Sequence, residues 1–159
     1  MGTPRVLVAA ESRHGSTREV AEAIAGHLTA GGCRVDLLTL EEIGALRPYD
    51  GVVLGSGMYL GRWLQPARRF MVERADEIRA CAVWLFSSGP VGSPPFPDPE
   101  TAFDPSGLVE ATGARGHRLF TRGPGHGEPG DTRDWAAIEE WSNEIADAVH
   151  ALNPGRTAH

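Results

Sequence analysis

Three short segments carry residue types that suit the binding of a phosphorylated aromatic ligand. The first reads Ser12-Arg13-His14-Gly15-Ser16-Thr17, between an apolar run and a helical pattern. Free backbone N–H groups at a helix start attract anions, and the three hydroxyl groups can add hydrogen bonds. Gly15 lets the main chain approach a phosphate closely. We predict a phosphate site here, although an ordinary capped helix start would use the same residue types.

This first segment lacks the two glycine-rich motifs that mark most nucleotide sites. It contains neither GxGxxG, typical of dinucleotide sites, nor GxxxxGK[ST], typical of nucleoside triphosphate sites. A single phosphate site without either motif favours a mononucleotide as the ligand.

The second segment combines glycines with aromatic residues. It reads Gly55-Ser56-Gly57-Met58-Tyr59-Leu60-Gly61-Arg62-Trp63 and is predicted to be a loop. Tyr59 and Trp63 do not follow a helix or strand periodicity that would point them into the core, so their rings can stack on a flat ligand. The glycines leave room for a ring system against the main chain. The alternative is that both aromatic side chains simply cover the edge of the core.

The third segment, Ser87-Ser88-Gly89-Pro90-Val91-Gly92, follows another apolar run. Its small residues can offer main-chain donors to the edge of a heterocycle, although Ser-Gly-Pro is also a common turn.

The elements around these segments alternate between strand and helix patterns. Predicted strands are Val6–Ala10, Arg34–Leu40, Gly51–Gly55, Cys81–Phe86 and His117–Thr121. Predicted helices contain Val20–Leu28, closed by Gly31 and Gly32, then Pro66–Ala80, Leu108–Gly113, and a last one from about Asp131 to Val149.

This alternation predicts an α/β fold, a doubly wound five-stranded parallel sheet of order 2-1-3-4-5 with helices on both faces. Ligands of such sheets bind beyond the carboxyl ends of the strands, at the switch point between strands 1 and 3. The three segments leave strands 1, 3 and 4, so we expect them to meet there. One domain over residues 1–152 and a frayed tail over 153–159 are expected.

The composition fits one soluble domain. The chain has 159 residues, 41% of them hydrophobic, and a net charge of −6, which argues against nucleic-acid binding and suits an electron carrier with basic partners. Cys33 and Cys81 lack metal-ligand spacing, so we predict no metal site. With no leader or transmembrane pattern, we expect a cytoplasmic protein. The oligomeric state stays open, a homodimer included.

At these segments the sequence resembles flavodoxins, and more closely flavodoxin-domain proteins related to menaquinone-dependent protoporphyrinogen oxidase. The phosphate loop of flavodoxins reads T/S-x-T-G-x-T, and these relatives often have S-x-H-G-x-T, as in residues 12–17 here. Similar runs are Gly61-Arg62-Trp63-Leu64, Trp84-Leu85-Phe86-Ser87-Ser88-Gly89-Pro90 and the Asp134–Trp141 part of the last helix. The resemblance covers about Arg5 to Val149. One departure is the region around the fifth strand, which is longer in the menaquinone-dependent enzyme and short here, from Arg122 to Asp131.

The resemblance implies FMN as the cofactor. Residues 12–17 would hold its phosphate, the second segment would line the isoalloxazine, and the third would face its far edge. The expected cofactor-binding residues are Ser12, Arg13, His14, Gly15, Ser16, Thr17, Ser56, Gly57, Met58, Tyr59, Gly61, Trp63, Ser87, Ser88, Gly89 and Gly92. No catalytic residue is singled out.

Three functions fit this reading. The first is an FMN-dependent oxidoreductase acting on a small redox substrate, a porphyrinogen or a quinone. The second is a flavodoxin-type electron carrier with a redox protein partner. The third is a flavodoxin-like binding module without FMN, against which the intact Gly15-Ser16-Thr17 argues.

Overall fold

The computed structural model describes residues 3–12, 15–59, 62–90, 105–122 and 135–152. Its strands are β1 (Arg5–Glu11), β2 (Arg34–Leu38), β3 (Gly51–Tyr59), β4 (Arg62–Trp63), β5 (Val83–Pro90) and β6 (Gly116–Arg122). Its helices are α1 (Ser16–Ala30), the 3₁₀ helix η1 (Leu40–Glu42), α2 (Gln65–Glu73), α3 (Ala75–Arg79), α5 (Pro105–Thr112) and α6 (Trp135–Leu152).

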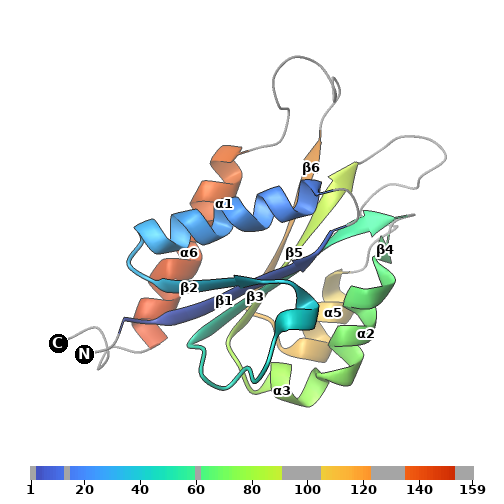
Figure 1. The fold of residues 1–159 in the computed structure, drawn as a ribbon, viewed down its shortest axis with the longest axis horizontal. Coiled ribbons are helices and arrows are strands. Elements are labelled where there is room, and N and C mark those ends of the chain that lie inside the picture. The colour runs from blue at the N-terminus through green and yellow to red at the C-terminus, as the bar shows by residue number, and fades with distance from the viewer. Residues whose placement is uncertain (1–2, 13–14, 60–61, 91–104, 123–134, 153–159) are drawn as a thin grey trace.

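The sheet has the order β2-β1-β3-β5-β6, with parallel pairing throughout that path. This confirms the predicted order 2-1-3-4-5. The short strand β4 lies off the path and pairs antiparallel with the end of β3. Helices α1 and α6 cover one face of the sheet, and α2, α3 and α5 cover the other (Figure 1). No helix among the described residues is long and apolar enough to cross a membrane.

Each face of the sheet has its own core, because neighbouring strand residues point to opposite sides. In β1, Val6 and Val8 belong to the core under α1 and α6, whereas Leu7 and Ala9 belong to the core under α2 and α3. All four side chains are buried. The continuous apolar run is therefore explained by a strand covered on both faces.

The first helix follows the prediction closely. Its apolar stripe packs on the sheet and on α6, and it ends at Gly31. Gly32 has a φ of 91°, in the left-handed region that favours glycine. A residue with a side chain would be strained at this φ, so glycine suits the turn between α1 and β2.

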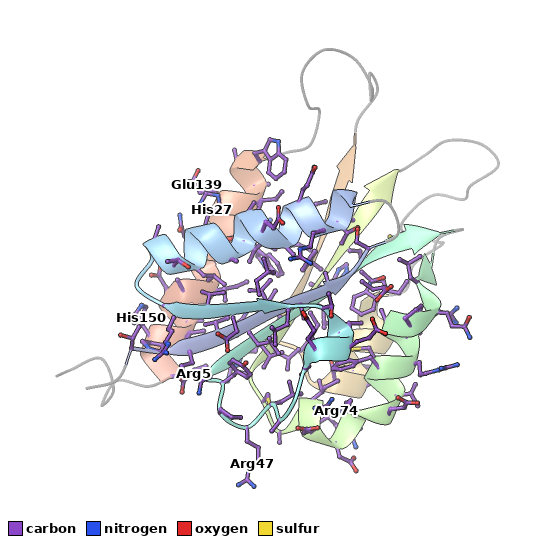
Figure 2. All side chains as sticks on the ribbon, viewed as in Figure 1. Arg5, His27, Arg47, Arg74, Glu139 and His150 are labelled. Carbon is purple, nitrogen blue, oxygen red and sulfur yellow. The ribbon has the colours of Figure 1, made fainter. Side chains whose placement is uncertain are left out.

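The predicted helix from Pro66 to Ala80 is divided in two at Arg74, whose φ of −109° and ψ of 19° leave the helical region. The Arg74 guanidinium pairs with Glu77 at 2.6 Å and donates to the Gly44 carbonyl. In Figure 2, Arg74 lies on the side of the sheet that carries α2, α3 and η1. The helix is therefore interrupted where Arg74 contacts Gly44, in the segment after η1. The spacing of apolar residues along the sequence does not indicate this interruption.

Other predicted boundaries shift as well. The predicted Cys81–Phe86 strand begins at Val83 and continues to Pro90 as β5, so the first four residues of the third segment lie in a strand. Strand β2 ends at Leu38, since the Thr39 N–H donates to Glu42 Oε1 at 2.8 Å and starts η1. The predicted Leu108–Gly113 helix begins earlier, at Pro105. The predicted loop from Gly55 to Trp63 is wrong over most of its length, since β3 continues to Tyr59 and β4 begins at Arg62. The expected start of the last helix near Asp131 lies outside the described residues.

A tight contact in the sheet gives the first testable prediction. A Cβ added to Gly55 would lie 2.3 Å from the Phe86 ring, and Phe86 is itself packed against Phe120 and Trp141. We expect Gly55→Ala to lower the free energy of unfolding by about 1–3 kcal/mol. Urea denaturation with a spectroscopic readout measures this change.

The matched control is Gly26→Ala in α1, where nothing lies within 4 Å of the added Cβ. There the substitution should raise the free energy of unfolding by about 0.5–1 kcal/mol, because alanine favours a helix interior. Equal effects of the two substitutions would contradict the close packing of Gly55 on Phe86.

Candidate functional site

Ser12, which follows β1, and Gly15 both precede the first turn of α1. Gly15 occupies the N-cap position with a φ of 87°. The Ser12 hydroxyl oxygen accepts hydrogen bonds from the N–H groups of Gly15 at 3.0 Å and Arg18 at 3.3 Å. Among the described residues, the amides of Ser16 and Thr17 have no acceptor. Amides in the first turn of a helix, at its positive end, are groups that can bind an anion.

Strand β3 brings the second segment beside the first. Its central position puts Ser56 next to Glu11 of β1 and Ser87 of β5, and Gly57 next to Ser88. A Cβ on Gly57 would lie 2.9 Å from the Thr17 hydroxyl oxygen and 3.8 Å from the Ser88 carbonyl oxygen. Segments from β1, β3 and β5 thus meet at the carboxyl ends of the strands, as predicted.

The predicted residues divide between the two faces of the sheet. Gly57 faces α1, where its neighbour is Thr17. Ser88 is buried, and its register opposite Gly57 places it at the same level of the sheet. Ser56 and Ser87 are fully buried and hydrogen-bond within the protein. These two side chains therefore stabilise the protein around the site.

Ser56 fixes the turn between β3 and α2. Its hydroxyl donates to the Gly57 carbonyl at 2.7 Å and accepts from the Leu64 N–H at 3.0 Å. Met58 is half-buried, and it pairs with Trp63 across the β3–β4 hairpin. Ser56 thereby joins both ends of the hairpin.

Trp63 is not in a loop, which corrects the sequence interpretation. It lies in β4, and its side chain is only 3% exposed and packs in the core on the α2 face. Its indole N–H donates to Ser87 Oγ at 2.7 Å. The position of Trp63 therefore agrees with the alternative given above, in which its ring covers part of the core.

A polar chain continues from Trp63 across the sheet. Ser87 Oγ lies 2.9 Å from Nε2 of His117 in β6. Burial lowers the pKa of His117 to about 4, so its imidazole is neutral at physiological pH. A neutral ring can offer the Nε2 lone pair to the Ser87 hydroxyl. Sequence analysis placed His117 only at the start of a strand, because nothing in the sequence indicates its pairing with Ser87.

Four predicted residues lie outside the described residues, namely Arg13, His14, Gly61 and Gly92. For Ser16, Tyr59 and Gly89 the structure gives the backbone, in α1, β3 and β5.

A cavity of about 580 Å³ lies on the other side of the end of β1, between η1 and α2. Glu11 and Glu41 contribute to its lining together with Phe70 and Arg69. Burial, and secondarily the negative charge of Glu41, raises the pKa of Glu11. Glu11 follows the alternation of Leu7 and Ala9, so its side chain faces away from α1. The sequence interpretation missed this cavity.

A comparison with protein families identifies the family to which the chain belongs. The flavodoxin domain model matches residues 7–101, which is more than half of the chain and extends from within β1 past the end of β5. The chain belongs to the flavodoxin-domain family. Family membership implies FMN as the cofactor. A search of curated proteins finds no match.

Solved structures of flavodoxins share the fold. A flavodoxin from the domain Archaea has a TM-score of 0.67 and 17% identity, over 91% of this chain and 98% of its own. Flavodoxin from Megasphaera elsdenii has a TM-score of 0.65 and 18% identity, over 89% of this chain and 98% of its own. These TM-scores show a common fold.

A larger protein shares the fold as well. Rubredoxin oxygen:oxidoreductase from Desulfovibrio gigas has a TM-score of 0.71 and 15% identity over 95% of this chain. This flavodoxin-domain chain spans only 37% of the length of that protein.

The described residues of this flavodoxin domain fit the phosphate end of FMN. The first turn of α1 contains the N–H groups of Ser16 and Thr17, and Gly57, which has no side chain, lies next to the Thr17 hydroxyl. A Cβ at Gly57 would come too close to Thr17 Oγ1. The donor set suits an anion, because every one of these groups can donate a hydrogen bond.

The lowered pKa of His117 gives a prediction on acid stability. The folded protein keeps this imidazole neutral down to about pH 4, whereas the unfolded chain protonates it near 6.5. Between these values the unfolded state binds more protons, so the free energy of unfolding falls as the pH falls from 6.5 to about 4. Gln cannot titrate, so His117→Gln should reduce this loss.

The measurement is urea unfolding of both proteins at about pH 7 and about pH 5. Carboxylates titrate in both proteins, so the difference between the two pH dependences isolates His117. An identical pH dependence in His117→Gln and the wild type would show that His117 has an ordinary pKa.

Proposed function

We propose that this flavodoxin domain is an FMN-dependent oxidoreductase that acts on a small redox substrate of the porphyrinogen or quinone class. The observation that carries the proposal is the meeting of the α1 N-terminus, Gly57 and Ser88 at one edge of the sheet. The substrate class rests on the resemblance of residues 12–17 and 61–64 to relatives of menaquinone-dependent protoporphyrinogen oxidase.

In the proposed site the protein binds and orients the cofactor. The amides of Ser16 and Thr17 and the hydroxyl of Thr17 would hold the FMN phosphate. Gly57 and Met58, at the end of β3, would lie along the isoalloxazine, with Ser88 on the β5 side. When bound, FMN supplies a ring that accepts and donates one or two electrons.

A pair of variants at glycines with positive φ tests the phosphate site. We expect Gly15→Asp to abolish FMN binding, because it puts a carboxylate where the phosphate would lie. Gly113→Asp is the matched control, with a φ of 69° and open space around the added Cβ, in the turn before β6. Both changes strain the backbone similarly, but only Gly15 lies at the proposed phosphate site. Only Gly15→Asp should therefore weaken FMN binding. Fluorescence titration of FMN measures the dissociation constant.

Thr17→Ala removes one donor and should weaken FMN binding about tenfold to a hundredfold, the range for a lost hydrogen bond to a charged group. Thr29→Ala, at the other end of α1, should leave FMN affinity unchanged, since the Thr29 hydroxyl donates to the Ala25 carbonyl. Wild-type protein that binds no FMN at about millimolar concentration, a very weak interaction, would overturn the proposed function.

A second function follows from the size of the domain. Two flavodoxins align with it over 98% of their own length, which favours an electron carrier that exchanges electrons with a redox protein. Steady-state assays separate the two functions, since an oxidoreductase would oxidise protoporphyrinogen with a naphthoquinone as the electron acceptor in the absence of any second protein. FMN-loaded protein that turns over neither compound, yet exchanges electrons with a redox protein, would make the carrier the correct function.

A further inference from the structure

The β3–β4 hairpin carries two of the residues expected beside the flavin, yet its own ladder is very short. Among the residues that the structure describes, two pairs form it, Met58 with Trp63 and Tyr59 with Arg62. A two-stranded hairpin alone is marginally stable in water. Strand β3 is itself held by its ladders with β1 up to Ser56 and with β5 up to Gly57, so other contacts must hold the last two residues of β3 and strand β4 in a single position.

Three contacts on the α2 side fix the second strand of the hairpin. The Leu64 N–H donates to Ser56 Oγ, and the Arg68 Nε–H donates to the Trp63 carbonyl at 3.0 Å. The Trp63 side chain is buried in the core and donates from its indole N–H to Ser87. Of these three contacts, the indole contact is the one that connects β4 to β5.

The orientation of Ser87 depends in turn on His117. An indole nitrogen is a donor only, so Ser87 Oγ must accept from Trp63. The hydroxyl proton of Ser87 is then free to point elsewhere, and His117 Nε2 lies 2.9 Å from Ser87 Oγ. With a lone pair on Nε2, the chain runs in one direction, from Trp63 through Ser87 to His117.

We propose that His117 is a positioning residue of the cofactor site, which holds Ser87 and Trp63 in place and thereby sets the position of the β3–β4 hairpin that carries Met58 and Tyr59. This inference rests on the proposed FMN function. His117 acts through two other side chains, from the far strand β6.

The location of the chain explains why it can matter for a ligand. Its three side chains come from β4, β5 and β6, and Ser87 is fully buried between the other two. Ser87 directly precedes Ser88, which lies next to Gly57 in the sheet. A shift of Ser87 therefore moves the β5 end of the site and, through Trp63, the β4 end as well.

Two substitutions at one position separate the hydrogen bond from the volume of the side chain. His117→Leu fills space but accepts no hydrogen bond, whereas the amide oxygen of His117→Gln can reach the place of Nε2. The first readout is the indole N–H resonance of Trp63 in ¹⁵N-labelled protein, assigned by comparison with Trp63→Phe and recorded without FMN. The second readout is the dissociation constant of FMN, with its midpoint potential measured on the loaded protein.

We expect His117→Leu to shift the Trp63 indole resonance and to weaken FMN binding about tenfold, as for one lost buried hydrogen bond. His117→Gln should restore both values to near those of the wild type. Ser142→Ala is the control for general destabilisation, because Ser142 is fully buried on the α6 side and donates to the Ile138 carbonyl. It should leave the indole resonance and FMN affinity unchanged.

The outcomes are distinct. An unchanged indole resonance and FMN affinity in His117→Leu, with FMN bound by the wild type, would overturn this inference and leave the proposed function intact. Equal weakening by Leu and Gln would also overturn it, since the acceptor would then be irrelevant. Wild-type protein without FMN affinity would instead overturn the proposed function, and with it the cofactor role of His117.

Discussion

The close approach of α1 and α6 to the central strand governs the geometry of this domain. On the face of β3 toward these helices, three of the four positions from 51 to 57 are glycine. Neighbouring side chains occupy the space of each missing Cβ, Val149 and Trp84 at Gly51, Phe86 at Gly55 and Thr17 at Gly57. Side chains on β3 would push these neighbours away. Because β3 has no side chains at these glycines, the first turn of α1 lies directly against the carboxyl end of β3.

Strand alternation then decides which polar residues can meet a ligand. Ser56 and Gly57 are neighbours in sequence but face opposite sides, and the same holds for Ser87 and Ser88. Ser56 and Ser87 are used in internal hydrogen bonds on the α2 side. Gly57 and Ser88 lie at the level of Thr17 on the other side. A shift of one residue in register would exchange these roles.

The sequence was sufficient for the strand order and for the meeting of three segments, because continuous apolar runs separated by helical stripes have few parallel arrangements. It was not sufficient for the individual residues. Gly55 to Trp63 looks like a loop by composition, yet pairing with β5 and hydrogen bonds to Ser56 and Ser87 make it a hairpin. The break at Arg74 and the pairing of His117 likewise depend on partners far along the chain.

The same alternation keeps negative charge away from the anion site. Glu11 directly precedes the phosphate segment, and a carboxylate facing the amides of Ser16 and Thr17 would compete with an anionic ligand. Its side chain instead lines the cavity between η1 and α2, beside Glu41, where burial raises its pKa. This partly buried carboxylate thus lies on the α2 face of the sheet. The N-terminus of α1 on the opposite face therefore keeps its positive potential for the ligand.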